Sequence, residues 1–219
     1  MNTAALTHGL LLFLAFVGLV ALHEFAHAWM AVRCGDDTPR LQGRLTLDPL
    51  AHIHWLGTIV LPLAVTVLGA AGGPSMLFGW GRPVEVNWNN FRHRRWDDIL
   101  VSGAGPAMNL LTAILILGVM KIIQLAGGTA YLNPILDLAR LSLFLCFFNL
   151  LPIPPLDGGH ILRNLVGMSD EAYHLLSQYS FLFLLLILRV PAIGQVVSLF
   201  TNSTLVLLAW PFGWHLSIS

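Results

Sequence analysis

The residues with the clearest chemical potential are two histidines four positions apart, His23 and His27, with Glu24 directly after the first. Residues i and i+4 lie on one face of a helix, so both imidazoles can bind a single Zn²⁺ ion. Glu24 then lies beside the metal, where its carboxylate can accept a proton from water. The pattern predicts a zinc-dependent hydrolase. The alternative is a structural one, in which neighbouring groups satisfy two helix-facing histidines and a buried glutamate.

This motif lies inside the first long apolar stretch of the chain, from about Ala5 to Val32. Outside the motif, the only ionisable side chain up to Val32 is His8. The stretch exceeds the ~20 residues that a helix needs to cross a bilayer, and it lacks the basic start of a cleavable signal peptide. Because an unpaired carboxylate in hydrocarbon is costly, we expect Glu24 to have a function there.

The composition is that of a polytopic membrane protein. Of the 219 residues, 56 % are hydrophobic and 10 % are charged, and the mean hydropathy of +0.75 is too high for an ordinary soluble domain. The formal net charge is zero, so we expect no nucleic-acid partner. Cys34 and Cys146 are too few and too far apart for a disulfide framework or a cysteine-based metal site.

The apolar stretches predict an all-α polytopic membrane protein with about five to six transmembrane or re-entrant helices. Their approximate limits are 5–32, 53–71, 99–125, 136–151, 175–188 and, more weakly, 196–210. A polar segment with alternating Val84, Val86 and Trp88 follows the second stretch and predicts a short re-entrant β segment. The sequence has no tandem repeat or low-complexity linker, so we expect residues 1–219 to form one domain.

A catalytic zinc ion usually has three protein ligands, so the two histidines need a third from another segment. Asp157 is the best candidate, because it follows a proline-rich run and precedes Gly158 and Gly159, which allow close approach of backbone or metal. On its own, an aspartate in such a turn fits a structural role equally well. His160 is a possible competitor as a ligand, but we expect it to lie at an interface or behind the ligands.

Four motifs together make the chain resemble the site-2 proteases, a family of intramembrane zinc metalloproteases. They cover most of the chain in the family's order: HEFAH at 23–27, GWGRP at 79–83, AGPAMN at 104–109 and NLLPIPPLDGG at 149–159. Without a PDZ domain or a nucleotide-binding or CBS module, the chain resembles the small branch of that family. Gly105 and Pro106 fit a structural role near a helix start, where proline suits the first turn and glycine permits close packing.

The resemblance implies one Zn²⁺ ion per chain, bound by His23, His27 and Asp157, with Glu24 activating the water. Asn149 matches the family's polar residue upstream of the ligand aspartate, which steadies the substrate carbonyl or its oxyanion. A donor of this kind in a dry site contributes roughly 3 kcal/mol. For Asn149 alone, a role in capping or bridging helices is nearly as good an interpretation.

The depth of these groups constrains the topology. The two histidines lie toward the C-terminal end of the first stretch, Asn109 lies near the start of the third, and Asp157 follows the fourth. If these groups share one depth, residues 53–80 must make an even number of crossings. We expect a re-entrant hairpin, broken at Pro62 and at residues 72–74, because irregular backbone at membrane depth is tolerated where protein covers it.

The basic residues predict the orientation. On the hairpin topology, the active-site end carries eight arginines and the opposite loop carries Lys121, with Arg140 near the opposite end of the fourth stretch. The eight are Arg33, Arg40, Arg44, Arg82, Arg92, Arg94, Arg95 and Arg163. The positive-inside rule then places the active site toward the cytoplasm. We expect a multi-pass protein of a bacterial or archaeal cell membrane.

The expected partners are the lipid bilayer and a transmembrane protein or peptide substrate; the sequence specifies no oligomeric state. A transmembrane helix hides its carbonyls in hydrogen bonds, so the substrate must be unwound before cleavage. The predicted strand can pair with the unwound segment by β-augmentation, and its candidate substrate-binding residues are Trp80, Gly81, Arg82, Pro83 and Val84. The alternative for this segment is an interfacial turn anchored by tryptophan.

A metal transporter or metal sensor that uses the same ligands is the alternative function. Transport needs ionisable groups along a path, whereas the predicted ligands cluster at one depth, which favours the enzyme. A catalytically silent scaffold is a third reading, but it predicts a damaged ligand or glutamate. His52 and His54 fit interfacial positions better than a second metal site.

Overall fold

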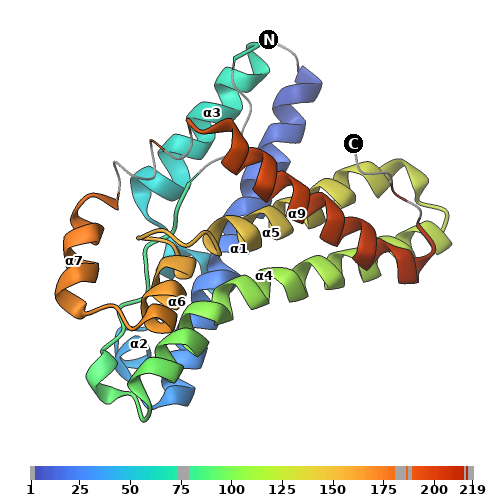
Figure 1. Ribbon diagram of the computed structural model, residues 1–219. Helices are drawn as coiled ribbons and strands as arrows, with labels where there is room; N and C mark the ends of the chain where they lie inside the picture. Colours follow the sequence, from blue (N-terminus) through green and yellow to red (C-terminus); the bar gives the residue numbers. More distant parts are fainter. Residues whose placement is uncertain (1–2, 74–78, 181–185, 187–188, 215, 217–219) are drawn as a thin grey trace.

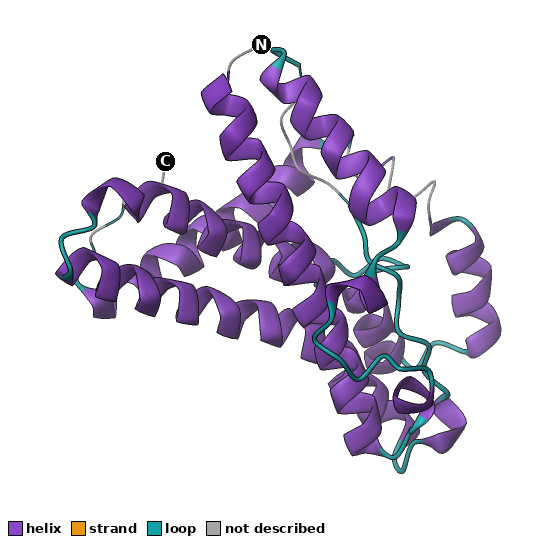
Figure 2. Cartoon of the chain, turned by 180° about the vertical axis from the view of Figure 1, so that it is seen from behind, coloured by secondary structure: helices purple, strands orange, loops and turns teal. Residues whose placement is uncertain are grey.

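The computed structural model describes residues 3–73, 79–180, 186, 189–214 and 216, which are helices joined by loops and turns (Figures 1 and 2). The longer helices are α1 (Thr3–Cys34), α3 (Leu61–Ala70), α4 (Arg94–Leu125), α5 (Leu132–Asn149), α6 (Asp157–Val166), α7 (Asp170–Gln178) and α9 (Pro191–Ala209). The short helical segments are α2 (Thr38–Leu41), η1 (Pro49–His52), η2 (Trp55–Val60), η3 (Trp88–Asn90), η4 (Thr129–Tyr131) and η5 (Trp210–Phe212).

Four helical segments in the described part of the chain are long and apolar enough to cross a membrane. They are Thr3–Cys34, Arg94–Leu125, Thr129–Asn149 and Pro191–Phe212, and a shorter apolar helix spans Trp55–Ala70. These segments confirm the prediction of an all-α polytopic membrane protein. The predicted stretch at 175–188 begins in α7 and continues into residues outside the described ones.

Helices α1, α4 and α5 form the core that positions the candidate site (Figure 1). Helix α4 is antiparallel to α1, because His27 contacts Val101 and His23 contacts Asn109. Ser142 of α5 donates a hydrogen bond to the Asn109 carbonyl, 2.7 Å away. The apolar contact between α1 and α5 consists of Phe16, Leu19, Val20 and Leu145. The C-terminal ends of α1 and α5 and the beginning of α4 therefore meet at one end of the core.

Helix α4 begins at Arg94, earlier than the predicted start near residue 99. The Asp97 carboxylate accepts the backbone N–H of His93 at 2.7 Å, which satisfies a donor near the start of the helix. As a result Pro106 lies in the interior of α4 and not in its first turn, where we predicted it. Polar residues at the start of α4 thus extend a helix that the apolar pattern alone places too late.

The segment between α1 and α4 forms a hairpin whose two ends lie side by side. The Trp80 N–H donates to the Gly57 carbonyl at 3.1 Å, and Thr58 Oγ1 donates to the Trp80 carbonyl at 2.8 Å. Pro62 lies in the first turn of α3, but η2 runs directly into α3 through the helical residues Val60 and Leu61, so the predicted break at Pro62 is wrong. The chain turns instead at Gly72, where φ is +90°. The ends agree with an even number of crossings; residues 74–78, including the predicted break at Pro74, lie outside the described part.

The predicted β segment is wrong for the described residues, because no strand lies beside it. The backbone from Trp80 to Val84 instead forms hydrogen bonds with the short helical segments η1 and η2 and with the Glu24 side chain. The Arg82 N–H donates to the His52 carbonyl at 2.8 Å, and the Val84 N–H donates to the Glu24 carboxylate at 3.2 Å. The alternation of apolar residues indicated an extended chain correctly, but its neighbours are helices and loops.

Two buried charged side chains fix this extended segment beside α1. Asp36 is fully buried and accepts hydrogen bonds from Thr38, Asn87 and Asn90. Burial alone would raise the pKa of Asp36, but these hydrogen bonds outweigh it and hold that pKa below its usual value. Arg44 is 4 % exposed and donates to three backbone carbonyls, those of Ala51, Arg82 and Pro83.

The hairpin makes a testable prediction about sidedness. With the buried Cys34 and Cys146 left in place, single cysteines at the exposed positions Gln42 and Asn89 should react with a membrane-impermeant maleimide from the same side. A cysteine at Ala130, which is exposed beyond α4, should react from the opposite side. Labelling of positions 42 and 89 from opposite sides would show that the intervening segment crosses an odd number of times.

Candidate metal centre

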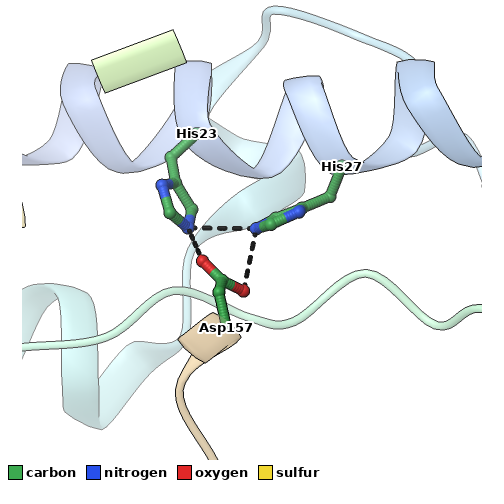
Figure 3. Close-up of side chains that lie close together, drawn as sticks. All are labelled: His23, His27 and Asp157. Atoms are coloured by element: carbon green, nitrogen blue, oxygen red, sulfur yellow. Dashed lines mark hydrogen bonds and ion pairs between the residues drawn. The ribbon is translucent and has the colours of Figure 1, made fainter. Parts of the chain in front are cut away.

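The structure brings together His23, His27 and Asp157 (Figure 3). The two Nε2 atoms lie 3.0 Å apart. Asp157 Oδ2 lies 3.2 Å from the His23 Nε2 atom, and Asp157 Oδ1 lies 3.3 Å from the His27 Nε2 atom. Both histidines are buried, with exposed fractions of 7 % and 8 %. Three groups that commonly ligate zinc thus converge on one point between α1 and α6.

Asp157 is held there by a close backbone approach that leaves no room for a side chain at the two residues after it. It is the first residue of α6, and Gly158 and Gly159 come next. A Cβ atom on Gly158 would lie 2.3 Å from the carbonyl oxygens of both Leu150 and Leu151. A Cβ atom on Gly159 would lie 2.7 Å from the Pro154 nitrogen. The two glycines therefore allow the chain to fold back on itself and present the carboxylate to α1.

The donor atoms fit a zinc ion in spacing and chemistry. With zinc–ligand distances of about 2.0–2.1 Å, tetrahedral ligand atoms lie about 3.3 Å apart, close to the observed separations. Asp157 Oδ2 is buried and has no hydrogen-bond partner among the described residues beyond its 3.2 Å contact with the His23 Nε2 atom. Gly105 leaves space beside the imidazoles, since a Cβ atom there would lie 2.4 Å from the His27 Nε2 atom and 2.7 Å from the His23 Nε2 atom.

Helix α4 also orients the two imidazole rings. The His27 Nδ1 atom lies 2.7 Å from the Val101 carbonyl oxygen, which accepts only a proton. Nδ1 therefore carries the proton and the Nε2 lone pair is available to a metal. The His23 Nδ1 atom lies 3.2 Å from the side-chain amide of Asn109. Both rings thus turn their Nε2 atoms toward Asp157.

Glu24 lies beside these groups and faces the extended segment. Its Oε2 atom accepts the Val84 N–H at 3.2 Å, and a Cβ atom on Gly81 would lie 3.1 Å from its Oε1 atom. The side chain is half-buried and lines the same cavity as the two histidines and Asp157. A carboxylate in this position can accept a proton from a water molecule in the cavity.

The cavity has a volume of about 490 Å³ and lies between α1, α4, α5, α6 and the extended segment. Of the five predicted substrate-binding residues, Trp80, Gly81, Pro83 and Val84 line it. Arg82 is not among the lining residues; its carbonyl accepts a hydrogen bond from Arg44. The remaining wall is largely apolar and includes Val20, Val86, Trp88, Leu145, Phe148 and Leu156.

Asn149 lies at the edge of this cavity as the last residue of α5. Its Nδ2 atom donates to the Leu145 carbonyl at 2.9 Å, so one amide proton is used within its own helix. The amide group has a second proton, which this hydrogen bond leaves for another acceptor. Asn149 therefore both hydrogen-bonds the last turn of α5 and lines the cavity.

The other candidate histidines lie outside the group of three. His160 lies between the rings of Trp88 and Tyr173, with centroid distances of 6.1 and 4.9 Å. His52 is buried, and its Nε2 atom lies 2.9 Å from the Thr46 carbonyl. His54 accepts the Gly57 N–H through Nδ1 at 3.1 Å. Within the described residues, His52 and His54 join no second group of potential metal ligands.

A buried ion pair holds α6 against α4. Arg163 and Asp98 are 4 % and 3 % exposed, and their charged atoms lie 3.6 Å apart. The Arg163 guanidinium also lies over the rings of Trp88 and Tyr173, at 4.6 and 5.0 Å, and 3.3 Å from Asp170. This cluster fixes the helix whose first residue is Asp157. Sequence reasoning missed it, because its members are far apart in the chain.

Comparison with known proteins identifies the family. The model of Peptidase family M50 matches residues 11–128 and 118–188. YwhC of Bacillus subtilis is 36 % identical over 183 residues, which cover 80 % of this chain and 78 % of that protein. Rip2 of Mycolicibacterium smegmatis is 33 % identical over 177 residues, which cover 80 % of this chain and 65 % of Rip2.

Both relatives are named as candidate zinc metalloproteases. Rip2 of Mycobacterium tuberculosis, named in the same way, is 35 % identical over 183 residues and is covered to 65 % of its length. No solved structure matches the chain. The family model covers well over half of the sequence, including the helices that bring the two histidines and Asp157 together. The chain belongs to peptidase family M50, the zinc-dependent site-2 protease family.

Proposed function

We propose that this protein is an intramembrane endopeptidase that cleaves peptide bonds in or near the transmembrane segments of other membrane proteins. The observation that carries the proposal is the convergence of His23, His27 and Asp157 at one end of membrane-length helices. Glu24 lines the cavity that these groups share. A hydrolytic centre in that position can reach a peptide bond that enters from the lipid.

We assign His23 Nε2, His27 Nε2 and Asp157 as the ligands of one zinc ion. When bound, zinc lowers the pKa of a water molecule to about 7 and polarises the substrate carbonyl. The donor spacing and the space left by Gly105 support this assignment. The three side chains leave a fourth position for water or substrate, as catalytic zinc sites require.

Glu24 is the general base in this proposal. Its carboxylate accepts a proton from the attacking water and then delivers that proton to the amine that leaves. The hydrogen bond from the Val84 N–H holds one carboxylate oxygen, so the other oxygen is available to the water. Asn149 has an amide proton left to donate to the carbonyl oxygen as negative charge develops there.

The extended segment supplies the place where an unwound substrate binds. Trp80, Gly81, Pro83 and Val84 line the cavity, and the absence of a side chain at Gly81 leaves room next to Glu24. Because no strand of the described residues lies beside this segment, a substrate can adopt an extended conformation along it. Specificity then depends on how readily the substrate helix unwinds and enters the cavity.

The orientation follows from the arginines at the active-site end of the helices. Arg33 is in the last turn of α1, and Arg94 and Arg95 begin α4, at the same end as the candidate ligands. Lys121 lies near the opposite end of α4. The positive-inside rule places this end on the cytoplasmic side of the cell membrane.

Replacement of Glu24 tests the catalytic assignment. Glu24→Gln should lower cleavage of a reconstituted transmembrane peptide about 10²- to 10⁴-fold, because the amide cannot accept the proton. Zinc bound per chain, measured by metal analysis, should not change. Glu171→Gln, an exposed substitution on α7, is the matched control and should cleave like the wild type. Zinc binding without cleavage by any of the three proteins would favour the metal transporter or sensor.

Replacement of Gly105 tests the metal site independently of activity. In Gly105→Ala the new methyl group would occupy the space between the imidazoles, and we expect zinc to bind roughly 10- to 100-fold more weakly, from overpacking of about 1–3 kcal/mol. Gly103→Ala is the control on the same helix, because its Cβ atom would have no neighbour within 4 Å. Circular dichroism should show the same helix content in both. Wild-type zinc affinity in Gly105→Ala would contradict the assigned site.

A further inference from the structure

Asn109 is the most deeply buried polar side chain next to the candidate ligands. It has no exposed surface, although it lies on a helix apolar enough to cross a membrane. Its Nδ2 atom lies 3.2 Å from the His23 Nδ1 atom, while its Oδ1 atom is buried and has no donor among the described residues. An amide in such an apolar setting is costly unless its hydrogen bonds are made.

The protonation of His23 decides which amide atom faces the ring. His23 directs Nε2 toward Asp157 and the His27 Nε2 atom. A neutral imidazole that ligates a metal through Nε2 carries its proton on Nδ1. An amide N–H₂ group beside that N–H would place two donors face to face. The oxygen of the amide is the group that the His23 Nδ1–H requires.

The two ends of an asparagine amide are distinguished by their hydrogen bonds. Exchange of the oxygen and nitrogen of Asn109 removes the conflict between two donors. It also gives the buried oxygen the donor that it lacks, while the N–H₂ group takes the buried position that has no hydrogen-bond partner among the described residues. The arrangement then matches that of His27, whose Nδ1 proton is accepted by the Val101 carbonyl at 2.7 Å.

We propose that Asn109 is a positioning residue of the metal centre, whose side-chain oxygen accepts the Nδ1 proton of His23. This contact fixes the tautomer of His23 and directs its Nε2 lone pair toward the metal. Ser142 of α5 contacts the same residue at a different group, because its hydroxyl donates to the Asn109 backbone carbonyl at 2.7 Å and not to the side-chain amide. Helix α4 thereby holds both histidines, one through a side chain and the other through its backbone.

The inference rests on the zinc ligands assigned above, and zinc affinity tests it without a measurement of cleavage. The full chain is purified in detergent, and the zinc dissociation constant is measured by competition with a chromophoric chelator. Asn109→Leu keeps the approximate size but has no acceptor, so zinc should bind about 10- to 100-fold more weakly. Asn109→Asp keeps an acceptor for the Nδ1 proton and should bind zinc within about threefold of the wild type.

Ser142→Ala is the matched control, because it removes the other hydrogen bond at this helix junction and leaves the amide in place. It should also bind zinc within about threefold of the wild type. Equal weakening by Ser142→Ala and Asn109→Leu would assign the loss to packing and overturn the proposal. A folded Asn109→Asp variant that loses zinc would also overturn it, because a carboxyl oxygen at this position can still accept the Nδ1 proton of His23.

Two results separate this inference from the proposed function. If the wild type itself binds no zinc, the assigned ligand set fails and the role of Asn109 fails with it. If the wild type binds zinc and Asn109→Leu binds it equally well, the ligands stand and only the positioning role is overturned. Circular dichroism of each variant, recorded with the zinc titration, identifies any change in folding.

Discussion

The meeting of Asp157 with two imidazoles of α1 is the contact on which the arrangement of this protein depends. Ionisable groups are costly in an apolar layer, so they are tolerated when they pair or share a metal. To pair here, the C-terminal part of α1, the first residue of α6 and the face of α4 must reach one depth. The antiparallel packing of α4 on α1 and the hairpin before Trp80 meet that requirement.

Buried polar contacts outside the centre hold its components in place. Asp36 and Arg44 fix the extended segment beside Glu24, and the ion pair of Asp98 with Arg163 fixes α6. These groups are buried near the cavity, where an unpaired charge would be costly. The cavity therefore has walls that are set by hydrogen bonds on one side and by apolar packing on the other. This division suits the proposed function, in which the site admits an apolar substrate and still holds water.

Sequence reasoning identified the components that depend on local spacing or on length. The i, i+4 histidines, the glycines after Asp157 and the apolar stretches each have a signal within a few turns of chain. The adjacency of Gly57 and Trp80 agrees with the even number of crossings that the sequence predicts. The sequence further indicated that the chain before Trp88 is extended, although Trp88 itself begins η3 and the neighbours of the segment are helices and loops.

The missed features depend on contacts between distant segments. Gly105 resembled an ordinary packing glycine until α1 placed two imidazoles against it. Asn109 belonged to a motif, but only the packing of α4 on α1 gave its amide a partner. Pro106 was placed in a first turn because the polar start of α4 has no apolar signal. A useful indication was available in Asn109 itself, since an amide within a long apolar helix needs a partner.

The central claim is that one zinc ion is bound by two imidazoles and a carboxylate from different helices. Zinc K-edge X-ray absorption of the purified protein tests it most directly, because outer-shell scattering counts imidazole ligands. The account predicts a first shell of nitrogen and oxygen atoms only, at about 2.0–2.1 Å, with scattering from two imidazoles. A sulfur ligand at about 2.3 Å, or scattering from fewer than two imidazoles, would contradict it.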